Sequence, residues 1–163
     1  MARARAASEG AKSRLGNDAA EARAPGDAKS RQPGANAEPL DEPIVEALRA
    51  ADDKKAHDLV VLDVREVASF TDYFVIASAA NTRQVQAIAD EIVERLKKLN
   101  RRAARVEGYR SAEWVLLDYG DFVCHVFEEK SRRFYDLERL WRDAARVELP
   151  REIAESGAGG ERA

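Results

Sequence analysis

Hydrophobic and polar residues alternate with two different periods along the central part of the chain. A period of three to four residues, typical of a helix with one buried side, begins near Asn81. Its apolar positions are Val85, Ile88, Ala89, Ile92, Leu96 and Leu99. Asn81 and Gln84 stand where a helix cap and its reciprocal partner are expected. The pattern predicts one long amphipathic helix that begins at this cap.

Runs typical of strands lie on both sides of this helix. Residues 58–67 form a compact β-branched run that suits a buried strand, and 71–78 is a second, aromatic-rich strand. After the helix, we expect a short strand near 103–107. Two further strands are expected at 113–118 and 122–128.

Two more helices are predicted at the ends of this series. Apolar positions indicate a short helix over about 43–54 and another over 131–144. In the second, one stripe is expected to face the core, formed by Phe134, Leu137, Leu140 and Trp141. The order helix, two strands, helix, three strands, helix predicts a mixed β-sheet covered by helices, of the α/β or α+β class.

Composition divides the 163 residues into one domain and two tails. Residues 1–38 contain no aromatic residue, so they bury too little apolar surface to offset the entropy of ordering. We expect a disordered N-terminal extension at 1–38, a single domain at 39–149 and a disordered tail at 150–163. No apolar run approaches the roughly 18–20 residues of a membrane helix, and a cytoplasmic location is expected.

The stretch EWVLLDYGDFVCHVF predicts a hairpin with an unusual mixture of side chains. A two-residue turn at Tyr119 and Gly120 places Trp114 opposite His125, whereas a bulged turn brings Trp114 beside Cys124. The first register gives an apolar face of Val115, Leu117, Phe122, Cys124 and Val126, and a mixed face of Trp114, Leu116, Val123, His125 and Phe127. A Trp on a less buried sheet face is typical of a protein docking site. The alternative is that helices cover both faces and Trp114 belongs to the core.

Acidic residues are concentrated around this hairpin. Against a single base, Arg110, residues 107–129 contain six acids: Glu107, Glu113, Asp118, Asp121, Glu128 and Glu129. Such a surface suits a basic protein partner and, with a net charge of -3, indicates little or no direct contact with nucleic acid. Asp118 and Asp121 lack supporting metal ligands, and the chain has no nucleotide-binding or hydrolase motif. We therefore expect no catalytic residue, metal or cofactor.

Several segments, in matching order and spacing, resemble the ribosomal silencing factor family, also called Iojap-like proteins. They are TDYFVIASAANTRQVQAIAD (71–90), EG (107–108), EWVLLDYGDFVCHVF and RRFYDLERLW (132–141). The resemblance covers about 40–149 and implies a fold similar to nucleotidyltransferases without nucleotidyl transfer. In line with this, Arg65 stands where a second catalytic acid would follow Asp63.

The resemblance also implies a partner. Family members bind the large ribosomal subunit at a protein of the subunit interface, the fourteenth of the large-subunit series, and sterically prevent the small subunit from joining when nutrients are scarce. A large-subunit assembly factor and a degenerate nucleotidyltransferase are the alternatives, and an exposed sheet face also suits a homodimer. The expected contacts are Trp114 and Leu116 as apolar anchors, Asp118 and Asp121 facing basic side chains, Tyr119 beside the turn, and Tyr73 and Glu107 where strand order brings them close.

Overall fold

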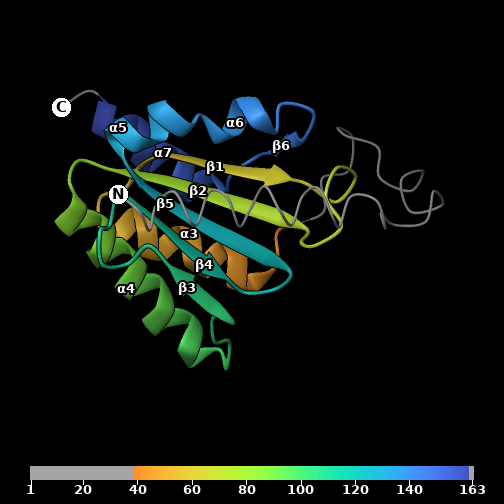
Figure 1. Ribbon diagram of the computed structural model, residues 1–163, viewed down its shortest axis with the longest axis horizontal. Coiled ribbons are helices and arrows are strands. Elements are labelled where there is room, and N and C mark those ends of the chain that lie inside the picture. Colours follow the sequence, from red (N-terminus) through yellow and green to blue (C-terminus); the bar gives the residue numbers. More distant parts are fainter. Residues whose placement is uncertain (1–38, 162–163) are drawn as a thin grey trace.

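The protein is described by a computed structural model over residues 39–161, with side chains described as far as Ser156. Within this range the strands are His57–Asp63 (β1), Tyr73–Ala79 (β2), Arg105–Glu107 (β3), Trp114–Asp118 (β4), Phe122–Glu128 (β5) and Ala145–Val147 (β6). They form one sheet in the order β3-β4-β5-β2-β1-β6 (Figure 1). β2 and β5 pair in parallel, whereas the other neighbours are antiparallel. The predicted mixed sheet of an α+β fold is confirmed.

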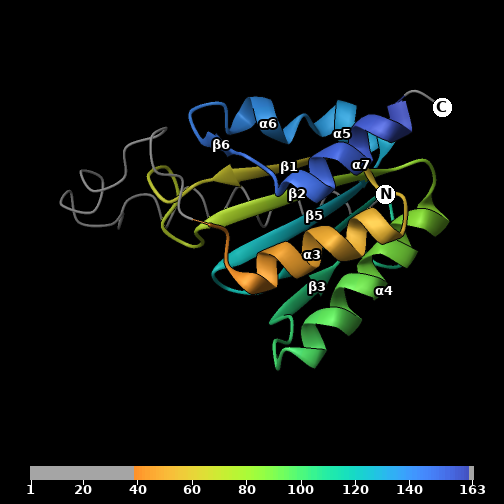
Figure 2. The same cartoon turned by 180° about the vertical axis from the view of Figure 1, so that it is seen from behind.

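Helices cover both faces of this sheet (Figures 1 and 2). One face carries Glu42–Asp53 (α3), Thr82–Lys98 (α4) and Arg151–Glu161 (α7), and the other carries Glu129–Tyr135 (α5) and Leu137–Leu140 (α6). A separate hydrophobic cluster fills the space on each side of the sheet. The hairpin strands β4 and β5 contribute side chains to both clusters, so they hold the two layers together.

Helix α4 confirms the sequence prediction in detail. The Asn81 side chain accepts a hydrogen bond from the Gln84 backbone N–H at 2.9 Å, and the Gln84 side chain accepts one from the Ala80 N–H at 2.8 Å. This reciprocal cap satisfies N–H groups that have no partner within the helix. The predicted stripe is buried at Val85, Ile88, Ala89, Ile92 and Leu96.

The predicted helix over 131–144 is broken at Asp136, which adopts a left-handed conformation with φ 44°. Arg132 and Tyr135 face the sheet from α5, whereas Leu137 and Trp141 are buried from α6 and the turn after it. In an unbroken helix, Leu137 would lie about 140° from Arg132, so both could not face the sheet. The predicted stripe is therefore wrong in part. Leu137 and Trp141 are buried, as predicted, but Phe134 and Leu140 are exposed.

The expected domain limits differ from the structure at the C-terminus. The composition predicts disorder over residues 150–163, whereas α7 occupies most of this segment and buries Ile153 against the cluster under α3. Glu152 also pairs with Arg49 of α3 at 3.0 Å. A single large apolar side chain in a Gly-rich segment gives no clear period, so the sequence pattern does not predict this helix. The extension at 1–38 lies outside the described residues.

Candidate partner-binding surface

The hairpin register differs from both predicted turns. Asp118 pairs with Val123, Leu116 with His125 and Trp114 with Phe127, so four residues lie between the last paired positions. The loop is closed by a hydrogen bond from the Tyr119 N–H to the Phe122 carbonyl at 2.9 Å. A slip of two residues leaves every side chain on its own face, whereas a slip of one would exchange the faces. The predicted apolar and mixed faces are therefore confirmed, although the turn was wrong.

The mixed face is buried rather than exposed. Trp114 and Leu116 are only 1% and 3% exposed. The Trp114 ring stacks on Phe127 and contacts Tyr135 of α5, each at 4.9 Å between centroids. This confirms the alternative in which helices cover both faces and Trp114 belongs to the core. Direct contact of a partner with either side chain would require the layer above it to move, so their role as anchors stays a prediction.

Trp114 and His125 form a buried polar pair on the mixed face of the hairpin. The Trp114 indole N–H donates to Nδ1 of His125 at 3.1 Å, and His125 Nε2 has no hydrogen-bond partner within the described structure. Burial lowers the pKa of His125 to about 3, because a charged imidazolium would lose its hydration there, and the negative charge of Asp118 opposes this only in part. His125 is therefore neutral at physiological pH and serves as a hydrogen-bond acceptor.

Arginines outside the hairpin sequence neutralise much of its negative charge. Arg101 forms an ion pair with Asp121, and Arg105 lies 3.5 Å from the Glu107 carboxylate and 3.9 Å from that of Asp118. Arg105 is directly opposite Asp118 because β3 pairs with β4. The acidic hairpin inferred from sequence is therefore an ion-pair network, since counting charges along the chain missed residues that only strand pairing brings close.

The seven residues expected at the partner surface do not all lie together. Strand pairing places Glu107 beside Leu116, on the same face as Trp114 and Asp118. The other three lie elsewhere: Tyr73 and Tyr119 pack against the cluster on the opposite face, and Asp121 reaches from the loop to Arg101. The register therefore unites four of the expected residues and separates three.

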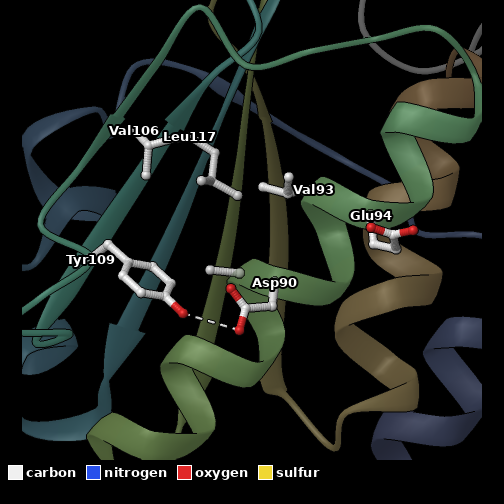
Figure 3. Close-up of a pocket in the computed structure, with 7 residues that line it drawn as sticks. Asp90, Val93, Glu94, Val106, Tyr109 and Leu117 are labelled. Carbon is white, nitrogen blue, oxygen red and sulfur yellow. Dashed lines mark hydrogen bonds between the residues drawn. The ribbon is translucent and has the colours of Figure 1, made fainter.

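An exposed groove lies at the β3 edge of the sheet, and the sequence reasoning missed it. We call it the edge groove; it has a volume of about 360 Å³ and is lined by Ala89, Asp90, Val93 and Glu94 of α4 together with Val106, Tyr109 and Leu117 (Figure 3). Val106 and Tyr109 are 48% and 40% exposed, and the Tyr109 hydroxyl donates to Asp90 at 3.0 Å. The apolar residues in and beside β3 were the only hint of this groove in the sequence. They line an exposed groove because β3 is an end strand, which the sequence pattern does not show.

No group of three or more His, Cys, Asp or Glu residues within 39–161 is placed to hold a metal ion. The helices in that range are all too short or too polar to cross a membrane.

Comparison with known proteins identifies the family. The profile described as "Ribosomal silencing factor during starvation" matches residues 37–162. Ribosomal silencing factor RsfS of Halalkalibacterium halodurans is 44% identical over 103 residues, which cover 63% of this chain and 88% of that protein. The mouse protein named "Mitochondrial assembly of ribosomal large subunit protein 1" is 34% identical over 91 residues, covering 54% of this chain and 40% of its own length.

A solved structure agrees with this assignment. A crystal structure of a Chromobacterium violaceum protein superposes with a TM-score of 0.62 and 33% identity, covering 69% of this chain and 91% of the other. The family profile spans all the described residues, including the hairpin, the capped helix α4 and the broken helix pair α5–α6. The chain therefore belongs to the ribosomal silencing factor family.

Proposed function

We propose that the protein binds the large ribosomal subunit at a protein of the subunit interface and prevents the small subunit from joining. The observation that carries this proposal is the family match across residues 37–162. The mechanism is steric and needs no catalysis, because a domain bound at the interface excludes the other subunit by its volume. The effect then follows the fraction of large subunits that are occupied.

The edge groove supports a basic protein as the direct partner. Its floor is apolar, with Val93 and Leu117, and Asp90 and Glu94 place carboxylates along the α4 wall. A protein that itself lies on RNA is rich in Lys and Arg, so these carboxylates complement it. β3 is an end strand of the sheet, so its outer edge has no neighbouring strand in the described structure and can pair with a strand of a partner. We propose that the interface protein docks here, with Glu107 at the border.

Val106→Lys is expected to weaken binding to purified large subunits at least tenfold. The substitution replaces an exposed apolar contact with a positive charge at the centre of the proposed interface, where the charge is desolvated and is repelled by a basic partner. Co-sedimentation at several protein concentrations measures the change. Val106→Thr, which keeps the branched shape without a charge, is the matched control and should bind within a few-fold of wild type.

The same experiment includes Trp114→Phe, which keeps an aromatic ring in the core. If this variant folds normally but loses the subunit while Val106→Lys retains it, the docking surface is the mixed face that the sequence indicated. That result would contradict docking at the edge groove and leave the proposed function intact.

The name of the mouse relative supports a second candidate, a factor for assembly of the large subunit. Both roles use the same partner, so the binding experiment cannot separate them. Deletion of the gene separates the two roles. Loss of an assembly factor leaves immature large subunits during growth in rich medium. Loss of a silencing factor leaves normal subunits that stay joined during starvation.

A further inference from the structure

The outer side of α5 and α6 presents an exposed aromatic ring among basic residues. Phe134 is 80% exposed and Leu140 is 52% exposed, and these are the two most exposed large apolar side chains in the described part of the chain. Lys130, Arg133 and Phe134 are spaced by three and four residues, so they lie on one side of α5. We call this outer side the α5–α6 surface; Figures 1 and 2 show the two helices following one another along the same side of the molecule.

The inner side of the same helices is fixed firmly to the sheet. Arg132 is buried and donates to the Asp58 carbonyl and the Ser78 hydroxyl, each at 2.7 Å, and to Glu138 at 2.9 Å. Tyr135 contacts the ring of Trp114. Because α5 is held on this side, Phe134 cannot turn inward and its exposure is a stable feature of the fold.

The charges of the α5–α6 surface are positive and available. Four exposed cations make no ion pair with any described residue: Lys130, Arg133, Arg139 and Arg142. By contrast, Glu129 is paired with His57 at 2.7 Å, and Glu138 is shared by Arg132 and Arg146. The remaining exposed carboxylates are Asp136 and Asp143. The surface therefore carries more unpaired positive than negative charge, opposite to the net charge of the whole chain.

We infer that the α5–α6 surface binds single-stranded RNA, with Phe134 stacking on an unpaired base and the flanking cations contacting phosphates. An exposed aromatic ring beside arginines is the arrangement by which proteins hold unstacked bases. A second copy of this chain fits less well, because it would bring like charges together. The inference rests on the proposed function, since a large ribosomal subunit presents RNA beside its proteins. The expectation of little or no contact with nucleic acid then applies only to the rest of the molecule.

Binding of a fluorescent single-stranded RNA of about 12 nucleotides to the full chain tests the inference directly. Fluorescence anisotropy gives the affinity at salt concentrations from about 50 to 200 mM. Phe134→Ala is expected to weaken binding about tenfold, and Phe134→Tyr to leave it unchanged, because a tyrosine ring also stacks. Phe134→Leu should weaken it nearly as much as alanine, since an aliphatic side chain retains the hydrophobic surface but cannot stack.

Salt dependence tests the role of the cations. Replacing Arg133 and Arg139 together by glutamine should reduce the slope of log affinity against log salt concentration by about 1.4, for two lost contacts with a single strand. The matched control replaces Lys97 and Lys98, which are exposed at the end of α4, and should leave the slope unchanged.

Three outcomes would overturn the inference. One is RNA binding that is unaffected by the Phe134 and Arg133/Arg139 variants, and another is no RNA binding at all. The third is preference for an acidic peptide with interspersed leucines, bound equally well by Phe134→Leu, which would make the surface a protein docking site. If the wild-type protein sediments with large subunits but does not bind RNA, only this inference is contradicted. If it binds RNA but not large subunits, the proposed function is contradicted.

Discussion

Gly108→Ala is expected to lower the free energy of unfolding by about 3 kcal/mol or more. Gly108 has φ +79°, a conformation that costs energy for any residue with a Cβ atom. In addition, that Cβ would lie 2.1 Å from the carbonyl oxygen of Trp114, far inside contact distance. A backbone oxygen cannot rotate away as a long side chain can, so β4 itself must move. This packing explains why the EG segment stands just before the hairpin.

Gly120→Ala is the matched control. Gly120 also has a positive φ, of +91°, but a Cβ there meets nothing within 4 Å. This variant should therefore lose only the conformational contribution, about 1 kcal/mol. Urea unfolding of the three proteins followed by circular dichroism gives both values. Equal losses for the two glycines would show that the close approach to Trp114 does not exist.

Acidification is expected to destabilise the fold through His125. The pKa of His125 is about 3 in the folded protein and about 6.5 in the unfolded chain. Below pH 6.5 the unfolded chain therefore binds a proton that the folded protein does not bind. The contribution of His125 to the free energy of unfolding is therefore fully present at pH values above its unfolded pKa. It is lost progressively as the pH falls towards the folded pKa. The expected loss from this group is about 1.6 kcal/mol between pH 6.5 and pH 5.

His125→Phe separates this effect from other titrations. The variant cannot take up the proton, although it deprives the Trp114 N–H of its acceptor and should cost about 1–3 kcal/mol at neutral pH. Its free energy of unfolding, measured with urea at each pH, should change less between pH 6.5 and pH 5 than that of wild type. A parallel decline in the two proteins would mean that His125 is already solvated or charged in the folded state.

The parts of the fold that depend on short-range rules could be predicted from the sequence. Helix α4 is the best example, because its cap at Asn81 and its apolar stripe are fixed within one segment. The face assignment of the hairpin also succeeded, because side chains alternate whatever the turn. Features that depend on distant partners could not be predicted: the break at Asp136 follows from what α5 and α6 pack against, and α7 is defined by the burial of Ile153.

The candidate surface was harder to predict for the same reason. Whether Trp114 is exposed depends on Tyr135, which lies 21 positions further along the chain. Whether the hairpin acids are free depends on Arg101 and Arg105, which strand pairing brings beside them. The resemblance of the motifs identified the family, but the local sequence could not show which side chains reach the surface.

Reassociation of purified ribosomal subunits in the presence of the wild-type protein is the most direct test of the proposed function. Separated large and small subunits are mixed with increasing amounts of the factor, and a sucrose gradient resolves joined ribosomes from free subunits. We expect the factor to sediment with free large subunits, and the joined fraction to fall in proportion to their occupancy. A factor that stays at the top of the gradient, or that binds large subunits while joining proceeds unchanged, would contradict the steric mechanism.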